Sequence, residues 1–159
     1  MVPAKRPRVV IDGLYGIESH GDDAMLLALV QGLRERIPAL HVTVLSRDPL
    51  QLRRSYGLHA IRNFDHPPFV RERGHWFYGF NPGQPRKHLG PVRETIARAD
   101  LLLIGGGNLL LDITHDWLRG PLAWHAISSE LARTYRDPYA LFANSIGPFA
   151  TPWGRDRAG

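Results

Sequence analysis

Short apolar runs alternate with helical segments along this chain. Two of the runs, Arg8–Asp12 (RVVID) and His41–Ser46 (HVTVLS), are rich in β-branched residues, and Asp100–Ile104 (DLLLI) and Tyr139–Asn144 follow later. Buried strands that alternate with helices are typical of right-handed crossovers in a parallel sheet. The sequence therefore predicts an α/β fold with a doubly wound, mostly parallel, Rossmann-like sheet of four to five strands.

Capping residues and helix breakers indicate where the helices lie. Asp22 and Asp23 are acidic residues at the start of a helix that ends at Pro38. Asp48 is expected to be the N-cap of a second helix, with Pro49 at its first position. Further helices are expected at Pro91–Ala99 and Leu122–Tyr135, and a short edge strand at His59–Arg62.

The composition excludes several kinds of site. The 159 residues contain no cysteine, which rules out disulfides, thiolate zinc sites and cysteine nucleophiles and suits a reducing cytoplasm. The 20 Lys and Arg residues outnumber the 15 Asp and Glu residues, for a net charge of +5, but they are scattered. The longest apolar run, Ala24–Val30, is far shorter than the about 20 residues of a membrane helix. We expect a soluble, cytoplasmic protein with no transmembrane segment, nucleic-acid partner, cofactor or metal site.

The expected domain spans residues 1–150, with an irregular excursion at 64–90 and a tail at 151–159 that leads to an absent second domain. The excursion carries four neighbouring aromatic residues: Trp76, Phe77, Tyr78 and Phe80. Loops of this length inside a compact domain are usually functional or mobile. The aromatic rings could form a stacking platform for sugars, pack the excursion onto the domain, or meet a partner surface.

A glycine-punctuated loop follows the first predicted strand. The spacing of Gly16 and Gly21 matches a P-loop, but Asp22 and Asp23 stand where that motif needs Lys and Ser or Thr. Two carboxylates there would repel a triphosphate, which excludes an NTPase. The G-x-G-x-x-G pattern of dinucleotide sites is also missing from this loop, so a nicotinamide or flavin site has little support.

What remains in this loop is the N-terminus of a helix with carboxylates on it. Its backbone N–H groups can bind anions or sugar oxygens, and Asp22 or Asp23 can accept hydrogen bonds from sugar hydroxyls. Alternatively, Asp22 caps the helix and Asp23 complements its dipole. His20 is either a group that titrates near neutral pH or an ordinary surface histidine.

A second glycine segment is more specific. Gly105, Gly106 and Gly107 directly follow an apolar strand, and Asn108 and Asp112 lie just beyond them. Three successive glycines lose much backbone entropy on folding, so they are expected where φ is positive or where a ligand approaches too closely for a Cβ atom. A tight strand-to-helix turn would explain one glycine but not three. We therefore predict a ligand site at this loop.

These segments, in this order, resemble the polysaccharide pyruvyltransferase family. The family pattern places G-x-x-N-x-G-D-E/D-A after the first strand, GGG-S/N-x-L-x-D after a central strand, and a GIGP turn after the next. Here the corresponding segments are Gly16 with Ser19–Ala24, then Gly105–Asp112, then Ser145–Pro148. Ser19 replaces the usual Asn, and Ser145 replaces the first Gly of the last motif.

The resemblance implies a transferase of polysaccharide biosynthesis with two domains of GT-B-like architecture, of which this chain supplies the first. Members transfer the carboxyvinyl group of phosphoenolpyruvate to a pair of sugar hydroxyls as a ketal and release phosphate. The groups that grip phosphoenolpyruvate lie mostly in the second domain, whereas the first presents loops that bind a sugar or glycan acceptor. The chain alone is therefore expected to be inactive.

Ketal transfer needs a general acid and a general base, for which His20 and Asp22 are the candidates. The candidate substrate-binding residues are Gly16, Ser19, Gly21, Asp23, Gly105, Gly106, Gly107, Asn108 and Asp112. Two other functions remain open. One is half of a GT-B nucleotide-sugar glycosyltransferase, and the other is a non-catalytic domain that pairs with another chain or with a second copy.

The topology gives these residues an expected meeting place. Loops after successive parallel strands emerge at one edge of a sheet, and a crevice opens where neighbouring strands have connections in opposite directions. We therefore predict that Gly16–Asp23 and Gly105–Asp112 line one pocket, with Asp22 or His20 facing Asn108. The Ser145–Pro148 turn is expected to border the same edge.

Overall fold

The computed structural model describes residues 6–16, 19–63, 89–112 and 121–149, together with positions 152, 155 and 156. Its strands are β1 (Arg8–Asp12), β2 (His41–Ser46), β3 (Ala60–Arg62), β4 (Leu101–Asp112) and β5 (Tyr139–Phe149). Its helices are α1 (His20–Arg36), α2 (Pro49–Tyr56), α3 (Leu89–Ala97) and α4 (Pro121–Tyr135). The strands form one parallel sheet in the order β3-β2-β1-β4-β5. The predicted doubly wound, Rossmann-like α/β fold is confirmed.

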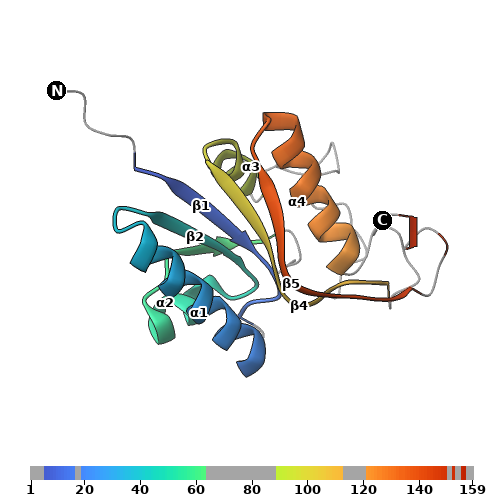
Figure 1. Cartoon of the computed structure of the whole chain (residues 1–159), viewed down its shortest axis with the longest axis horizontal. Helices are drawn as coiled ribbons and strands as arrows, with labels where there is room; N and C mark the ends of the chain where they lie inside the picture. Colours follow the sequence, from blue (N-terminus) through green and yellow to red (C-terminus); the bar gives the residue numbers. More distant parts are fainter. Residues whose placement is uncertain are drawn as a thin grey trace.

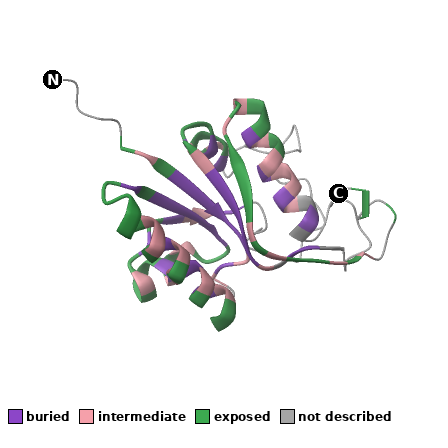
Figure 2. Ribbon diagram, in the orientation of Figure 1, coloured by how far each residue is buried: buried purple, intermediate pink, exposed green. Residues whose placement is uncertain are grey.

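Helices cover both faces of this sheet. The pair α1 and α2 lies on one face, and α3 and α4 lie on the other (Figure 1). Because side chains alternate along a strand, β1 contributes to both cores: Val9 and Ile11 pack with Leu26 of α1, whereas Val10 packs with Val92 of α3. The central strands are accordingly buried, and the outer helix surfaces are exposed (Figure 2).

Some predicted features lie outside the described residues. Of the excursion predicted at 64–90, only Leu89 and Gly90 are described, and they form the start of α3, which begins and ends two residues earlier than expected. The aromatic cluster at 76–80 and most of the tail at 151–159 are not described, and the division into domains stays a prediction. No helix in the described part of the chain has both the length and the apolar character to cross a membrane.

The start of α1 corrects the interpretation of Asp22 as the cap of this helix. The N-cap is Ser19, whose backbone oxygen accepts a hydrogen bond from the N–H of Asp23 at 3.0 Å. Asp22 therefore lies in the first turn and does not cap the helix. Both Asp22 and Asp23 are placed to complement the positive end of the helix dipole.

The start of α2 follows the predicted cap. Asp48 Oδ1 accepts hydrogen bonds from the backbone N–H groups of Leu50 and Gln51, each at 3.0 Å. Asp48→Ala is expected to lower the free energy of unfolding by about 1 kcal/mol, because two N–H groups lose their acceptor. Ser19→Ala is the matched control, since the Ser19 side chain makes no capping hydrogen bond. Equal losses in urea unfolding of the two variants would contradict this account of the cap.

The segments predicted as a glycine loop and a GIGP-like turn are strands. β4 continues through Gly105–Gly107 to Asp112, and β5 continues through Ser145–Pro148 to Phe149. The extensions pair with each other, Gly107 with Asn144 and Asp112 with Phe149, with register shifts between. Beyond the ends of the other strands they run together away from the sheet (Figure 1). The predictions of a loop and a turn were wrong because each segment finds its hydrogen-bonding partner in the other, about 40 residues away.

Candidate functional site

The two glycine segments meet at one edge of the sheet. β1 and β4 are direct neighbours, with Val9–Asp12 paired in parallel to Leu101–Ile104. The chain leaves β1 toward β2 on one side and reaches β4 on the other, so their carboxyl ends form the topological switch point where open α/β sheets bind ligands. A Cβ atom on Gly13 would overlap the backbone oxygen of Gly105. The predicted segments meet where the Asp22 carboxylate lies against Gly107, whereas the pocket expected between them stays a prediction.

Each of the three successive glycines accommodates a different neighbour. A Cβ atom on Gly105 would overlap the backbone oxygen of Phe142 in β5. On Gly106 it would overlap the side chain of Tyr15, and on Gly107 the carboxylate of Asp22. Gly106 and Gly107 have φ values of +87° and +105°, as the sequence predicted for part of this segment. The missing side chains therefore let a tyrosine and a carboxylate lie directly against β4.

The glycines of the first loop differ from each other. Gly16 has a φ of +75°, and a Cβ atom there would lie 2.5 Å from Ser46 Oγ and 2.9 Å from the backbone nitrogen of Asp48. Close packing against the end of β2 is thus sufficient to require glycine at this position. Gly21 is exposed in the first turn of α1, and nothing lies within 4 Å of an added Cβ atom. No described neighbour requires glycine at position 21.

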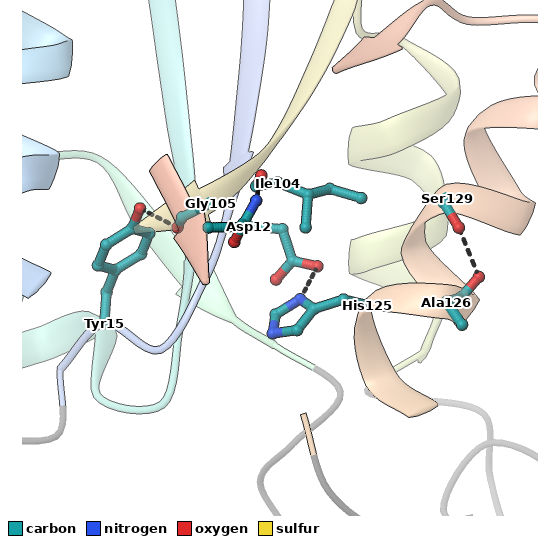
Figure 3. A network of polar contacts seen from close by, with 8 residues as sticks. Asp12, Tyr15, Ile104, Gly105, His125, Ala126 and Ser129 are labelled. Carbon is teal, nitrogen blue, oxygen red and sulfur yellow. Dashed lines mark hydrogen bonds and ion pairs between the residues drawn. The ribbon is translucent and has the colours of Figure 1, made fainter. Parts of the chain in front are cut away.

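Tyr15 is a buried residue of the site that the sequence interpretation missed. Its hydroxyl donates a hydrogen bond to the backbone oxygen of Gly105 (Figure 3). The backbone oxygen of Tyr15 accepts a hydrogen bond from Ser46 Oγ at 3.0 Å. Burial, followed by the charges of Asp12, Asp22 and Asp23, raises the pKa of Tyr15 well above its usual value. The phenol therefore stays protonated and fixes the first loop to β4. The feature of the sequence that could have identified Tyr15 is its position as an aromatic residue between Gly13 and Gly16.

A buried carboxylate–imidazole pair lies on the other side of β4. Asp12, the last residue of β1, places Oδ2 at 2.9 Å from Nδ1 of His125 in α4 (Figure 3). Both side chains are only 4% exposed. His125 Nε2 is buried and has no hydrogen-bond partner among the described residues. The sequence interpretation missed this pair, although a carboxylate ending an apolar strand was a visible signal.

The carboxyl edge of the sheet holds further buried polar atoms that lack partners in the described part of the chain. They are Asp23 Oδ1, Asn63 Oδ1 just after β3, and Asn144 Oδ1 in β5. Buried polar groups in proteins nearly always have a hydrogen-bond partner, so such a group calls for an explanation. All three atoms lie at the carboxyl edge of the sheet, where open α/β folds bind ligands. A bound ligand would supply the hydrogen-bond partners that these atoms lack.

A comparison with protein families decides the classification. The family described as polysaccharide pyruvyl transferase matches residues 20–159. The chain belongs to the polysaccharide pyruvyl transferase family. This is a transferase family of polysaccharide biosynthesis, and its match includes α1, the glycine segment of β4 and all of β5. No curated protein sequence matches the chain.

The family motif residues of α1 have distinct surroundings. His20 is exposed at the first position of the helix, and Ser19 and Asp22 are half-buried. Asp23 is buried, and its Oδ2 accepts a hydrogen bond of 3.0 Å from the Tyr56 hydroxyl, which raises the pKa of Tyr56. Asp22 thus faces Gly107, whereas Asp23 joins α1 to α2.

The remaining motif residues are described only in part. Asn108 and Asp112 lie in β4, but their side chains fall outside the described structure, so the predicted contact between Asp22 or His20 and Asn108 is not tested. The Ser145–Pro148 segment pairs with β4 and therefore borders the predicted edge. In the part of the chain that the structure describes, no three His, Asp or Glu side chains come together to form a metal site.

A surface hollow of about 390 Å³ lies elsewhere. Its walls include Arg8 and His41, the first residues of β1 and β2, and His59, which precedes β3. Glu94 of α3 and Arg98, just after that helix, also contribute. Burial, together with the charges of His41 and Arg53, lowers the pKa of His59. Because parallel sheets bind ligands at the carboxyl ends of their strands, this hollow is separate from the candidate site.

Proposed function

We propose that this domain binds the sugar acceptor of a pyruvyl transfer at the carboxyl edge of β1 and β4. The donor is phosphoenolpyruvate, whose carboxyvinyl group becomes a ketal on a pair of sugar hydroxyls while phosphate is released. Membership of the family supports the reaction class. The groups that grip the donor are assigned to a second domain of GT-B-like architecture. A cytoplasmic location fits a reaction that consumes phosphoenolpyruvate.

The acidity of this edge is the observation that carries the acceptor role. Asp12, Asp22 and Asp23 all act on the Tyr15 phenol and oppose its ionisation. A sugar acceptor offers hydroxyl groups that donate hydrogen bonds to carboxylates. Phosphoenolpyruvate carries a phosphate and a carboxylate, and like charges repel each other in a site of this kind. The edge therefore favours the acceptor over the donor.

Within this proposal, the motif residues divide between binding and proton transfer. Asp22 and His20 are the proposed acid–base groups, and the Asp22 carboxylate also lies against Gly107 of the glycine segment. Ser19 and the backbone of Gly21 lie at the N-terminus of α1, where N–H groups can bind sugar oxygens. The other proposed substrate contacts are Gly16, Asp23, Gly105, Gly106, Gly107, Asn108 and Asp112.

Sugar binding by the 159-residue chain tests the proposal. Methyl β-galactoside and methyl α-mannoside are titrated while the amide resonances of Gly105–Gly107 are followed by NMR. At least one glycoside is expected to shift these resonances, and Asp22→Asn is expected to raise its Kd about tenfold or more, because a hydrogen bond to a charged group is lost. Glu35→Gln removes a carboxylate from the far end of α1 and should leave the Kd unchanged. If Asp22→Asn and Glu35→Gln change the Kd equally, Asp22 does not contact the sugar.

Phosphate release tests the assignment of the donor groups. The isolated chain is expected to release no phosphate from phosphoenolpyruvate with either glycoside, because the acidic edge offers no grip for the donor. The measurement is a coupled phosphate assay on homogeneous protein. Turnover above that of a buffer blank would show that the donor groups lie within these 159 residues.

One observation favours the alternative function, a non-catalytic domain that pairs with another chain or with a second copy. Among the described strands β5 lies at an edge of the sheet, and much of it is exposed (Figure 2). Its apolar residues Tyr139, Leu141 and Ile146 are 47%, 55% and 67% exposed. Exposed apolar side chains on a strand at the edge of a sheet favour contact with another polypeptide. A stable dimer in sedimentation equilibrium, combined with no glycoside binding, would favour this function over transfer.

A further inference from the structure

The Asp12–His125 pair is too costly a feature to be explained by packing alone. Two ionisable side chains, each 4% exposed, are buried between α4 and the end of β1. Taking such groups out of water is unfavourable unless every polar atom finds a partner. One atom, His125 Nε2, has none among the described residues. A buried ring nitrogen without a partner is a hydrogen-bonding position available to a ligand.

The contact with Asp12 determines what Nε2 can do. A carboxylate can only accept, so the ring must donate the hydrogen bond from Nδ1, which carries the proton. In the neutral imidazole this leaves the lone pair on Nε2. The carboxylate thereby fixes both the tautomer and the orientation of the ring, as the orienting carboxylate does in other acid–base dyads.

The pair lies at the switch point of the sheet. In the register of β1 and β4, Asp12 pairs with Ile104, the residue before the glycine segment. Tyr15 and His125 lie on opposite sides of this point (Figure 3). Asn144, whose Nδ2 donates to the Ile104 backbone oxygen at 2.9 Å, adds another buried and unpartnered oxygen from β5 within the described structure. The edge therefore offers polar atoms on the α4 face as well as on the α1 face.

We propose that His125 is a catalytic base that contacts an acceptor hydroxyl through Nε2, and that Asp12 is its positioning residue. This inference rests on the proposed function and adds a base on the α4 face, opposite Asp22 and His20. Ketal formation deprotonates a pair of hydroxyls, so it needs proton acceptors at more than one position.

The step assigned to His125 is the one in which phosphate leaves. The O–H bond of the second hydroxyl breaks, and its proton goes to Nε2. The electron pair of the hydroxyl oxygen forms the new bond to the ketal carbon. The bond from that carbon to the phosphate oxygen breaks, with its electron pair remaining on phosphate. The proton then passes from Nε2 to the released phosphate, which returns the imidazole to its starting state.

Imidazole ¹⁵N NMR on the 159-residue chain tests this assignment. The free protein is expected to show a protonated Nδ1 and an unprotonated Nε2 at His125. Adding the methyl glycoside that shifts the Gly105–Gly107 amides is expected to shift the Nε2 resonance as well. A pair with only a structural role would keep its Nε2 resonance unchanged when sugar binds.

Asp12→Asn is the matched variant. Its amide can donate to Nδ1, which moves the ring proton to Nε2 and converts an acceptor into a donor, so the Kd for the glycoside is expected to rise at least tenfold. Asp48→Asn makes the same chemical change at a helix cap, where Asn serves as well as Asp, and should leave the Kd unchanged. If Asp12→Asn does not fold, the role of His125 is tested by the Nε2 resonance of the unsubstituted protein when the glycoside is added.

The outcomes separate this inference from the proposed function. Sugar-induced shifts at the glycine amides with an unchanged His125 Nε2 would overturn the role of His125 and leave acceptor binding intact. No shift at either position with any glycoside would overturn both. A resting tautomer with the proton on Nε2 would also overturn the role as a base.

Discussion

Alanine at position 105 is expected to lower the free energy of unfolding by about 3 kcal/mol, at the upper end of the range for overpacking. The new Cβ atom would overlap the backbone oxygen of Phe142 and lie only 3.0 Å from its Cα atom. Both atoms belong to β5, whose pairing with β4 fixes their distance. Backbone atoms in a paired strand cannot turn aside as a long side chain can, so the strands must separate.

The measurement is urea unfolding, with two other glycines as references. Gly21→Ala meets no atom within 4 Å in the first turn of a helix, so it should be neutral or stabilising by roughly 0.5–1 kcal/mol. Gly107→Ala meets the Asp22 carboxylate, with Cγ at 3.1 Å, and is strained by its φ of +105°. A Gly105→Ala variant as stable as Gly21→Ala would show that β4 and β5 are not packed as described.

The parallel sheet could be predicted from the sequence because its signals are local. The runs at 8–12 and 41–46 match β1 and β2 residue for residue, and Asp48-Pro49 marks the start of α2. The alternation of these elements limits the topology to a few crossovers. The approach of Asp22 to Gly107 follows from that topology, since β1 and β4 end at the same edge.

The extensions of β4 and β5 could not be predicted in the same way. Glycine has a low intrinsic preference for strands, so Gly105–Gly107 has the composition of a loop. What makes this segment a strand is its pairing with β5, whose residues lie nearly 40 positions away. Bulged pairing with a distant partner leaves no periodic pattern in either segment.

The buried groups of the site were missed for a related reason. Asp12 and His125 are 113 residues apart, and neither lies in a recognisable motif. A lone histidine in a helix with apolar neighbours is usually a core or surface residue, and only the tertiary structure shows that its ring meets a carboxylate. The family motifs identify the α1 face of the edge, whereas the α4 face emerges from the tertiary structure.

Removing either member of the Asp12–His125 pair is expected to lower the free energy of unfolding, because the other member is left buried without its partner. The loss is about 3–5 kcal/mol for His125→Ala, which leaves a charge, and about 1–3 kcal/mol for Asp12→Ala, which leaves a neutral ring. Asp12→Ala leaves an imidazole with no acceptor for its Nδ1 proton. His125→Ala leaves a carboxylate that is 4% exposed and has lost its 2.9 Å hydrogen bond. Each of these states retains the desolvation of a polar group and loses the interaction that offset it.

The double variant distinguishes this explanation from simple loss of packing. With both groups removed, no unpaired charge remains, so the loss should be smaller than the sum of the single losses by about 1–3 kcal/mol. The exposed Glu130–Arg133 pair, with side chains 57% and 73% exposed, is the control, and Arg133→Ala should leave stability nearly unchanged. Denaturant unfolding of the four Asp12 and His125 combinations gives the coupling directly. Strictly additive losses would mean that Asp12 and His125 stabilise the fold independently, and the hydrogen bond between them would then have no energetic role.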